Sequence, residues 1–335
     1  MKPLSHLAIF LLAGALASAA GVTEFELLRK MPPGRLAALT AADYPDAQGF
    51  TGGNHKEGHW IGVGMQRGGC RALIAALVAN DPVAADDAWR AIDTAFAHQQ
   101  ADGGFDSTPA PDIGPADEHT ARVQTVFFFL QELGHAILVI RQSPFEPRFH
   151  ARIAAVEPKM RRACAFLSAG YDTIIASSSK AVNRIIIAAK AFGLCGLALH
   201  DDALVATSRK LIAHALALRD AEGVFIEEGG RDSSYNAVSI LFGQVLALHL
   251  AIPEFDAALP SAVKWQLTRI RDTGEVRVDG NTRTGVGKET YLGKPKGVNY
   301  PEAVLAFTYF GLAHNDGAAL AAADKVFAWS RTHQE

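Results

Sequence analysis

Cysteine is scarce in this sequence, and the few that occur are not spaced for a metal site. Three cysteines, Cys70, Cys164 and Cys195, are found among 335 residues, and no CxxC or Cys/His metal spacing is present. All three lie in patterns rich in Ala and Leu, so we expect small buried hydrophobic side chains rather than a disulfide or a nucleophile. An odd number of cysteines in an exported protein also leaves at least one of them unpaired.

An excess of charge of one sign is also lacking, as are several common enzyme motifs. With 32 basic and 35 acidic residues the formal net charge is -3, so no overall field attracts nucleic acid, and none is expected as a partner. A preference for an anionic substrate must then come from local Lys and Arg groups. No GxSxG elbow, Walker loop or GxGxxG motif is present, which argues against the enzyme classes that depend on them. We expect neither a metal nor a cofactor.

The N-terminus has the features of a secretory signal peptide. Lys2 precedes an apolar run at residues 7–17, and Ala17-Ser18-Ala19 is a small-x-small cleavage pattern. The run is too short for a comfortable membrane span, although an uncleaved lipid-facing anchor is the alternative. We therefore expect residues 1–20 to be a signal peptide and 21–335 to be a single exported domain, periplasmic or secreted. No later segment approaches eighteen uninterrupted apolar residues, so no membrane contact is expected after cleavage.

Alternation of apolar and polar residues with a period of two, the pattern of a β-strand, is nearly absent. A series of helical patterns is found instead. Apolar residues recur at three- and four-residue steps, with Pro and Gly between the patterns. VFIEE at 224–228 and EVRVD at 275–279 are the only strand-like fragments. The sequence thus predicts an all-α fold. The expected helices span residues 71–79, 86–99, 118–140, 152–170, 180–199, 201–218, 236–251, 261–271, 301–314 and 317–331.

A weak internal repeat runs through the chain. Each unit is a helix, a Gly-containing turn led by Asp or Glu, an extended piece, a polar loop and another helix. The units begin with AFAHQQADGGFDS, HALALRDAEGVFIEEGG and KWQLTRIRDTGEVRVDG. Helical hairpins of this kind cannot bury both faces alone, so we expect them to stack and close into an α/α toroid with an inner and an outer ring. The polar loops would then gather at one end, around a central cleft.

The first polar segment is GGNHKEGHWIGVGMQRGG at residues 52–69. His55 and His59 are four apart and would share a helix face, as a zinc site on a helix requires. However, HKEGH lacks the acid that directly follows the first histidine in HExxH, and Gly58 weakens a helix. The alternatives are a substrate-binding loop, with Trp60 as a platform for a sugar ring, and an ordinary loop.

Another polar segment, ASSSKAVNRII at residues 176–187, lies at the start of an apolar helix. Its serines are natural N-cap residues. Asn183 and Arg184 lie among apolar neighbours, so they must find polar partners or face a cavity. Lys180 and Asn183 are three apart and would share a helix face. If that face belongs to the inner rim of the toroid, both side chains point into the cleft.

Two polar loops occupy equivalent positions of the repeat. FIEEGGRDSSYNAV at residues 225–238 holds Asp232 and Ser233, either of which can cap the following helix. A cap does not explain the rest of the loop: Glu227, Glu228, Arg231, Tyr235 and Asn236. The partner loop, residues 279–300, is long, rich in glycine and cationic. Around Tyr291 it carries Arg283, Lys288, Lys294 and Lys296. A solvated loop is the simpler interpretation, but long loops in compact domains tend to be functional or disordered.

One reaction uses Tyr, Arg, Lys, Asn and His on an anionic polymer without a metal cluster, namely β-elimination at a uronic acid. Cations or amides neutralise the C5 carboxylate and so acidify the adjacent C–H, and stabilising the developing enolate is the larger contribution. A Tyr, His or Lys takes the proton, and a Tyr or His protonates the leaving oxygen. Clustered Arg and Lys would lower the pKa of a tyrosine base, and Tyr291 and Tyr235 both have cations nearby in sequence.

The helical repeats, the Asn-Arg helix start, the GG-x-DSSY loop and the later Arg/Tyr loop resemble α/α-toroid polysaccharide lyases, in particular those acting on alginate or glucuronan. The resemblance covers roughly residues 50 to 310. It implies that Asn54, His55 and Asn183 neutralise the carboxylate. It also implies that tyrosine and arginine transfer the protons. The catalytic residues are then expected to be Tyr235, Tyr291, Arg283 and His55. The expected substrate-binding residues are Asn54, His59, Trp60, Lys180, Asn183, Arg184, Glu228, Arg231, Asn236 and Lys288.

Two other functions remain open from the sequence. A glycoside hydrolase on the same toroid would need two carboxylates about 5–9.5 Å apart. The available carboxylates are Asp106, Glu228, Asp232 and Glu289. An exported, non-catalytic sugar-binding toroid would have scattered aromatic residues in the cleft and no need for Tyr beside Arg. The expected partner of the enzyme is an anionic polysaccharide.

Overall fold

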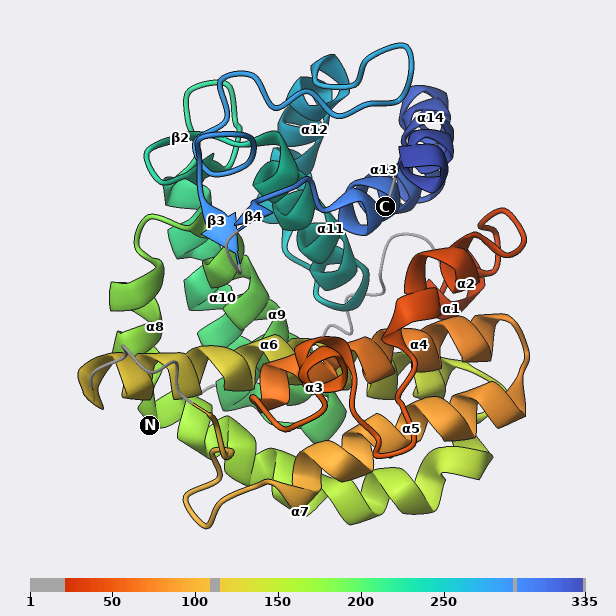
Figure 1. Ribbon diagram of the computed structural model, residues 1–335, viewed down its shortest axis with the longest axis vertical. Coiled ribbons are helices and arrows are strands. Elements are labelled where there is room, and N and C mark those ends of the chain that lie inside the picture. Colours follow the sequence, from red (N-terminus) through yellow and green to blue (C-terminus); the bar gives the residue numbers. More distant parts are fainter. Residues whose placement is uncertain (1–21, 109–114, 292–293, 334–335) are drawn as a thin grey trace, which may run out of the picture.

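The fold is built almost entirely from α-helices, as the apolar periodicity predicts (Figure 1). The computed structural model describes residues 22–108, 115–291 and 294–333, and these contain fourteen α-helices. Ten of them match the expected helices: α4 (Arg67–Val78), α5 (Pro82–Ala97), α6 (Pro115–Gln142), α7 (Glu146–Ala169), α9 (Val182–Leu199), α10 (Asp202–Ala217), α11 (Ser233–His249), α12 (Pro253–Thr268), α13 (Tyr300–His314) and α14 (Gly317–His333). The expected signal peptide, residues 1–20, lies outside the described residues.

Short elements complete the chain. The sequence patterns do not predict the helices α1 (Glu24–Leu28), α2 (Arg35–Thr40), α3 (Gly52–Glu57) and α8 (Tyr171–Ser178). Two antiparallel strand pairs join β1 (Ile226–Glu227) with β2 (Gly230–Arg231), and β3 (Thr290–Tyr291) with β4 (Lys294–Pro295). VFIEE therefore supplies β1, whereas EVRVD forms no strand and makes one isolated bridge, between Ile270 and Val276.

The long helices fall into two sets that alternate along the chain. Helices α4, α6, α9, α11 and α13 form the first set, and consecutive members of it pack against each other. Each member also packs against a helix of the second set, in the pairs α4–α5, α6–α7, α9–α10, α11–α12 and α13–α14. Helices α1 and α2 contact α13 and α4, the last and first members of the first set (Figure 1).

Helices α6 and α9 are apolar enough to span a membrane by length and composition alone. In the most apolar windows of Asp117–Gln142 and Val182–Leu199, however, 78% and 89% of the residues are buried inside the protein. A helix that is hydrophobic on all sides is typical of a protein core as well as of a membrane. Their apolar character is therefore explained by their central position in the first set. The three cysteines are also buried and free, as expected.

The predicted repeat has a structural counterpart in one recurring turn. In each turn a backbone N–H donates to the carbonyl four residues later, and a glycine N–H in between donates back to the first residue. The bonded first and last residues are Gln100 and Gly104, Asp220 and Val224, Arg271 and Glu275, and Asp46 and Phe50. The first three turns belong to the three predicted units. The fourth, at Asp46–Phe50, was not predicted.

The turn requires glycine for two reasons, which Gly103 and Gly274 illustrate. Both have positive φ, 89° and 94°, a conformation that costs other residues energy. In addition, a Cβ on Gly103 would lie 2.3 Å from the carbonyl oxygen of Arg162 in α7, and one on Gly274 would lie 2.1 Å from that of Lys325 in α14. Each turn thus seats directly on the next helix of the second set, and this contact fixes the spacing between successive helical pairs.

A second recurring turn connects a helix of the first set to the next helix of the second set. Asp81, Asp201 and Asp316 each donate a backbone N–H to a carbonyl in the last turn of the helix before. Their side chains then accept bonds from the first N–H groups of α5, α10 and α14. These connections are short, so the long polar loops lie at the other end, where the helices of the first set begin.

Candidate active site

Four side chains from two loops and one helix form what we call the loop cluster: Glu227, Tyr235, Arg283 and Glu289. Arg283 is its centre. Its Nη1 lies 3.0 Å from Glu227 Oε2, its Nε and Nη2 lie 3.0 and 3.3 Å from the two carboxylate oxygens of Glu289, and its guanidinium carbon lies 4.0 Å from the centroid of the Tyr235 ring. A bidentate ion pair and a cation–π contact therefore meet on one arginine.

Asp232 holds the two loops of the cluster together. Its Oδ1 accepts from the backbone N–H groups of Ser234 and Tyr235, which is the N-cap expected from the sequence. Its Oδ2 accepts from the backbone N–H groups of Arg283 and Thr284, at 2.9 and 2.8 Å. One buried carboxylate thus starts α11 and fixes the 279–300 loop over it. As a result, Tyr235 and Arg283 face each other although they are far apart in sequence.

Glu227 connects the cluster to the beginning of α9. It is completely buried, and its Oε1 accepts from the backbone N–H of Asn183 at 2.7 Å. Burial raises the pKa of Glu227 to about 7, because the Asn183 N–H and the Arg283 charge offset the burial only in part. The first N–H groups of a helix carry a partial positive charge, so a carboxylate is well placed here.

Tyr235 keeps its proton in this setting. Burial raises its pKa well above 10, and the neighbouring Glu289 and Glu227 carboxylates add to the rise, while Arg283 opposes it. The hydroxyl donates to Glu289 Oε2 at 3.4 Å. The sequence-based expectation that clustered cations would lower the pKa of this tyrosine is therefore wrong for Tyr235, because burial raises the pKa most and the neighbouring carboxylates add to the rise.

Lys296 and Arg184 add positive charge at the edge of the loop cluster. The ammonium of Lys296 lies 5.7 Å from the centroid of the Tyr235 ring. Burial lowers the pKa of Lys296, and the charges of Arg283 and Arg67 lower it further, against Glu289 and Glu302. Despite its partial burial, Glu289 has a lowered pKa, because Arg283, Lys296 and Arg184 stabilise its charge. Its side chain is 38% exposed, so it is the member of the cluster that faces solvent.

The four predicted site residues of the 52–69 segment make their contacts outside the loop cluster, although Arg67 of the same segment lies close enough to act on Lys296. Asn54 is fully buried and braces its own loop, accepting from the N–H groups of Ile61 and Gly62. The exposed His55 pairs with Asp46 at 2.9 Å. His59 is also exposed and contacts the backbone carbonyl of Glu57. Trp60 stacks on His98, with ring centroids 3.8 Å apart.

The remaining candidate residues differ in burial and in their distance from the loop cluster. Arg231 pairs with Asp220 and Glu222 and lies over the Trp265 ring. Asn236 is buried and donates to Gln266 at 2.9 Å. Glu228 is an exposed turn residue with φ of 50°, and Lys180 and Lys288 are exposed as well. Asn183 lies beside the cluster, and its buried side-chain oxygen has no hydrogen-bond partner. The backbone of Tyr291 is in β3, but its side chain lies outside the described residues.

A second group of charged residues, the central network, lies deeper in the protein and was not predicted. The fully buried Glu24 accepts from Tyr309 at 2.6 Å and contacts His135 and His249 at 2.7 and 2.6 Å. His135 also contacts Glu132 at 3.2 Å, and Lys190 contacts Glu132 at 3.2 Å. Lys190, Glu132 and His135 are charged or polar residues inside apolar helical patterns. The reasoning that singled out Asn183 and Arg184 could therefore have found them.

Comparisons with protein-family models, with curated proteins and with solved structures give no match. Function therefore has to be inferred from the chemistry of the two charged groups themselves. In the part of the chain that the structure describes, no three His, Cys, Asp or Glu side chains are grouped so that they could hold a metal ion. The loop cluster instead offers a fixed arginine, a protonated tyrosine and an exposed carboxylate, and Lys296 at its edge adds an amine with a lowered pKa.

Proposed function

We propose that the chain is a polysaccharide lyase that cleaves a uronic-acid-containing polysaccharide, of the alginate or glucuronan type, by β-elimination at the loop cluster. The observation that carries the proposal is the contact of Tyr235 with the Arg283 guanidinium, at 4.0 Å, where the arginine is fixed by two carboxylates. A proton donor and a group able to neutralise a uronate thus lie side by side.

The proposed architecture is an α/α toroid. Helices α4, α6, α9, α11 and α13 would form its inner ring, and α5, α7, α10, α12 and α14 its outer ring, with α1 and α2 between α13 and α4. The alternation of the two helix sets and the two recurring turns support this arrangement. The loop cluster would lie at the end where inner helices begin. Their partial positive charge favours an anion at that end.

Arg283 is the proposed binding group for the uronate carboxylate, with Arg184 beside it. In the free protein Glu289 occupies the Nε–Nη2 edge of Arg283 as a bidentate carboxylate. This is also the geometry in which an arginine binds a substrate carboxylate. Because Glu289 is partly exposed, a uronate can take its place on Arg283. Glu227 is fully buried and keeps the guanidinium in position.

In the proposed reaction the C5–H bond of the uronate breaks and its proton goes to the Lys296 amine. The electron pair forms the C4=C5 double bond, and the bond from C4 to the glycosidic oxygen breaks. Tyr235 donates its proton to that oxygen, and the Lys296 ammonium then returns a proton to the tyrosine through solvent. The raised pKa of Tyr235 suits a proton donor, and the lowered pKa of Lys296 suits a proton acceptor. No cofactor is needed for this sequence of steps.

The proposal includes export, since the predicted signal peptide would deliver the enzyme to a polysaccharide outside the cytoplasm.

Hydrolysis is the second candidate, because a Glu227 pKa of about 7 is typical of a general acid. Glu227 has no exposed surface, however, and both of its oxygens are already bonded, to Asn183 and to Arg283. A sugar oxygen therefore cannot reach it as it stands, which makes elimination the better-supported reaction.

The deciding experiment follows ultraviolet absorbance with the purified protein on polymannuronate, polyguluronate, glucuronan and pectate. Elimination gives an unsaturated uronate end, so the absorbance rises. Tyr235→Phe is expected to lower kcat by about 10²–10⁴-fold, whereas the control Tyr171→Phe, in α8, is expected to leave it unchanged. The rate should rise with pH until Lys296 has lost its proton, at a pH below the ordinary lysine value. New reducing ends without a rise in absorbance would indicate hydrolysis instead of elimination. If neither reducing ends nor absorbance appeared, the proposal would be overturned.

A further inference from the structure

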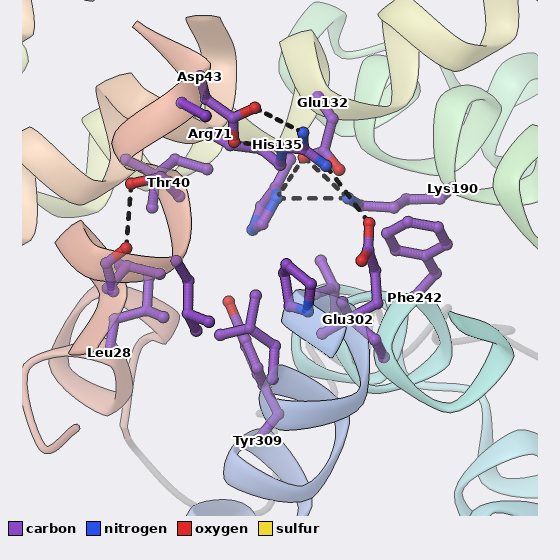
Figure 2. A pocket seen from close by; sticks show the side chains of 18 residues that line it. Leu28, Thr40, Asp43, Arg71, Glu132, His135, Lys190, Phe242, Glu302 and Tyr309 are labelled. Atoms are coloured by element: carbon purple, nitrogen blue, oxygen red, sulfur yellow. Dashed lines mark hydrogen bonds and ion pairs between the residues drawn. The ribbon is translucent and has the colours of Figure 1, made fainter. Parts of the chain in front are cut away.

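A cavity of about 220 Å³ lies between the helices of the first set, and none of the four loop-cluster residues lines it. Side chains from α1, α2, α4, α6, α9, α11 and α13 line it, and Figure 2 shows them around an open centre. Tyr235 of the loop cluster and Phe242 of the cavity wall are seven residues apart on α11. At 1.5 Å per residue the two regions are therefore roughly 10 Å apart along that helix.

The charged residues in the cavity wall are already paired with one another. Arg71 lies 2.9 and 2.7 Å from the two carboxylate oxygens of Asp43, and 3.4 Å from Glu302. Lys190 contacts Glu132 at 3.2 Å and lies 4.7 Å from the centroid of the Phe242 ring (Figure 2). An ionic ligand would have to break one of these pairs, and would then leave a buried charge without a partner.

Most of the remaining lining is apolar, including Leu241, Phe242 and Val245 of α11 and Leu305 of α13. The other polar residues in the wall have partners inside the protein, since Thr40 donates to the Leu36 carbonyl and both Tyr309 and His135 contact Glu24. An apolar cavity of about 150 Å³ engineered in another protein stays dry and binds benzene. A cavity of about 220 Å³ with paired wall charges therefore has room for a somewhat larger uncharged molecule.

The cavity has an entrance between α2 and α13. Leu39, Pro301, Glu302 and Leu305 are partly exposed, whereas Leu241 and Val245 on the opposite wall are buried. The contact of Arg71 with Glu302 crosses from α4 to α13 at 3.4 Å, and is longer than the usual charge-assisted bond of about 2.7–2.9 Å. A weak pair at the entrance can open without disturbing the shorter bonds of Arg71 to Asp43.

We infer that the central cavity is a binding site for a small uncharged molecule with an apolar body, about the size of a bicyclic aromatic ring. The paired charges of its wall select against ions, and its apolar lining provides the favourable burial. This second site does not depend on the proposed lyase reaction.

Calorimetric titration of the full chain tests the inference. Indole is the neutral probe of matching size, and benzyl alcohol, benzoate and benzylamine are a set that differs in charge. Indole and benzyl alcohol are expected to bind, and benzoate and benzylamine at least tenfold more weakly than benzyl alcohol. Val245→Phe fills the cavity from α11 and is expected to weaken indole binding at least tenfold. Val83→Phe, the same change at an exposed position of α5, is the control.

Two further measurements keep the test decisive if Val245→Phe does not fold. Leu305→Phe fills the cavity from α13 and is expected to have the same effect. Hydrogen exchange of the wild type needs no variant, and indole should protect amides of α11 and α13 rather than those of the 279–300 loop. Absence of indole binding at millimolar concentration, equal binding of benzoate, or protection elsewhere would each overturn the inference, whatever the lyase assay gives.

Discussion

Glu24 in the central network and Glu227 in the loop cluster are both completely buried and both paired with cationic groups, yet their pKa values move in opposite directions. Burial raises both. For Glu24 the charges and hydrogen bonds of His135 and His249 outweigh burial, so its pKa falls well below the usual value. For Glu227 the N–H of Asn183 and the charge of Arg283 do not suffice, and the pKa rises to about 7.

The difference comes from how the positive charge is shared. Two imidazoles and a tyrosine hydroxyl, from three helices, surround the single carboxylate of Glu24, and of these only His135 also contacts another carboxylate, that of Glu132. Arg283, in contrast, divides its charge between Glu227 and Glu289, while Asp232 adds a negative charge nearby. The central network therefore favours its ionised state, whereas the loop cluster holds more carboxylate than its arginine can stabilise. A site of this kind can release its most exposed carboxylate, which is Glu289.

The largest effect is expected from breaking the central network. Glu24→Ala should lower the free energy of unfolding by roughly 3–5 kcal/mol, because it leaves His249 and Tyr309 buried without their acceptor and His135 with Glu132 alone. Urea denaturation of both proteins at pH 7 measures the loss. Since the folded-state pKa of Glu24 is lowered, the advantage of the wild type should shrink as the pH falls below about 4.3, the unfolded value. Glu26→Ala, at an exposed residue of the same helix, is the control, and an equal loss in both variants would contradict the comparison.

A smaller effect is expected at Glu227, where the stability should change with pH in the opposite direction. Its folded-state pKa of about 7 lies above the unfolded value, so the folded state holds a proton that the unfolded state has already released. Between about pH 4.5 and 7 the stability of the wild type relative to Glu227→Gln should therefore fall as the pH rises, by about 3 kcal/mol in total. Denaturation of both proteins at several pH values gives this difference directly. A difference that does not change with pH would show that folding does not raise the pKa of Glu227.

The smallest effect is expected from removing the charge that competes for Arg283. In the proposed lyase reaction, Glu289→Gln should lower KM for the anionic polysaccharide by roughly two- to fivefold, the range of an exposed ion pair, because the uronate would no longer displace a carboxylate from Arg283. Steady-state kinetics at constant ionic strength measure the change. Glu222→Gln removes a similar exposed charge that pairs with Arg231 and should leave KM unchanged. A higher KM in Glu289→Gln would mean that Glu289 helps to hold the substrate.

The long helices could be predicted from the sequence because their apolar periodicity extends over several turns. Helices as short as α1 and α3 could not, since they depend on contacts with distant segments for their stability. The recurring glycine turn was found where long helices flank it. The turn at Asp46–Phe50 was missed because long helices do not flank it.

For the site, the repeat indicated that the loops containing Tyr235 and Arg283 correspond, and the structure brings these two residues into contact. The direction of the Tyr235 pKa could not be predicted, because it depends on burial and on the distance to Glu289. Lys190 was visible as a charge within an apolar helix. Glu24 was not, because nothing near it in sequence reveals its partners.

The position of Glu24 at the very start of the described chain also bears on the order of folding. Its partners His135, His249 and Tyr309 follow 111, 225 and 285 residues later. A chain that emerges N-terminus first therefore carries this carboxylate without its full set of hydrogen-bond donors until Tyr309 in α13 has been synthesised. Contacts of such long sequence separation slow folding. The first helix, α1, is thus secured last, and a chain truncated before α13 would lack the tyrosine that completes the hydrogen bonds of Glu24.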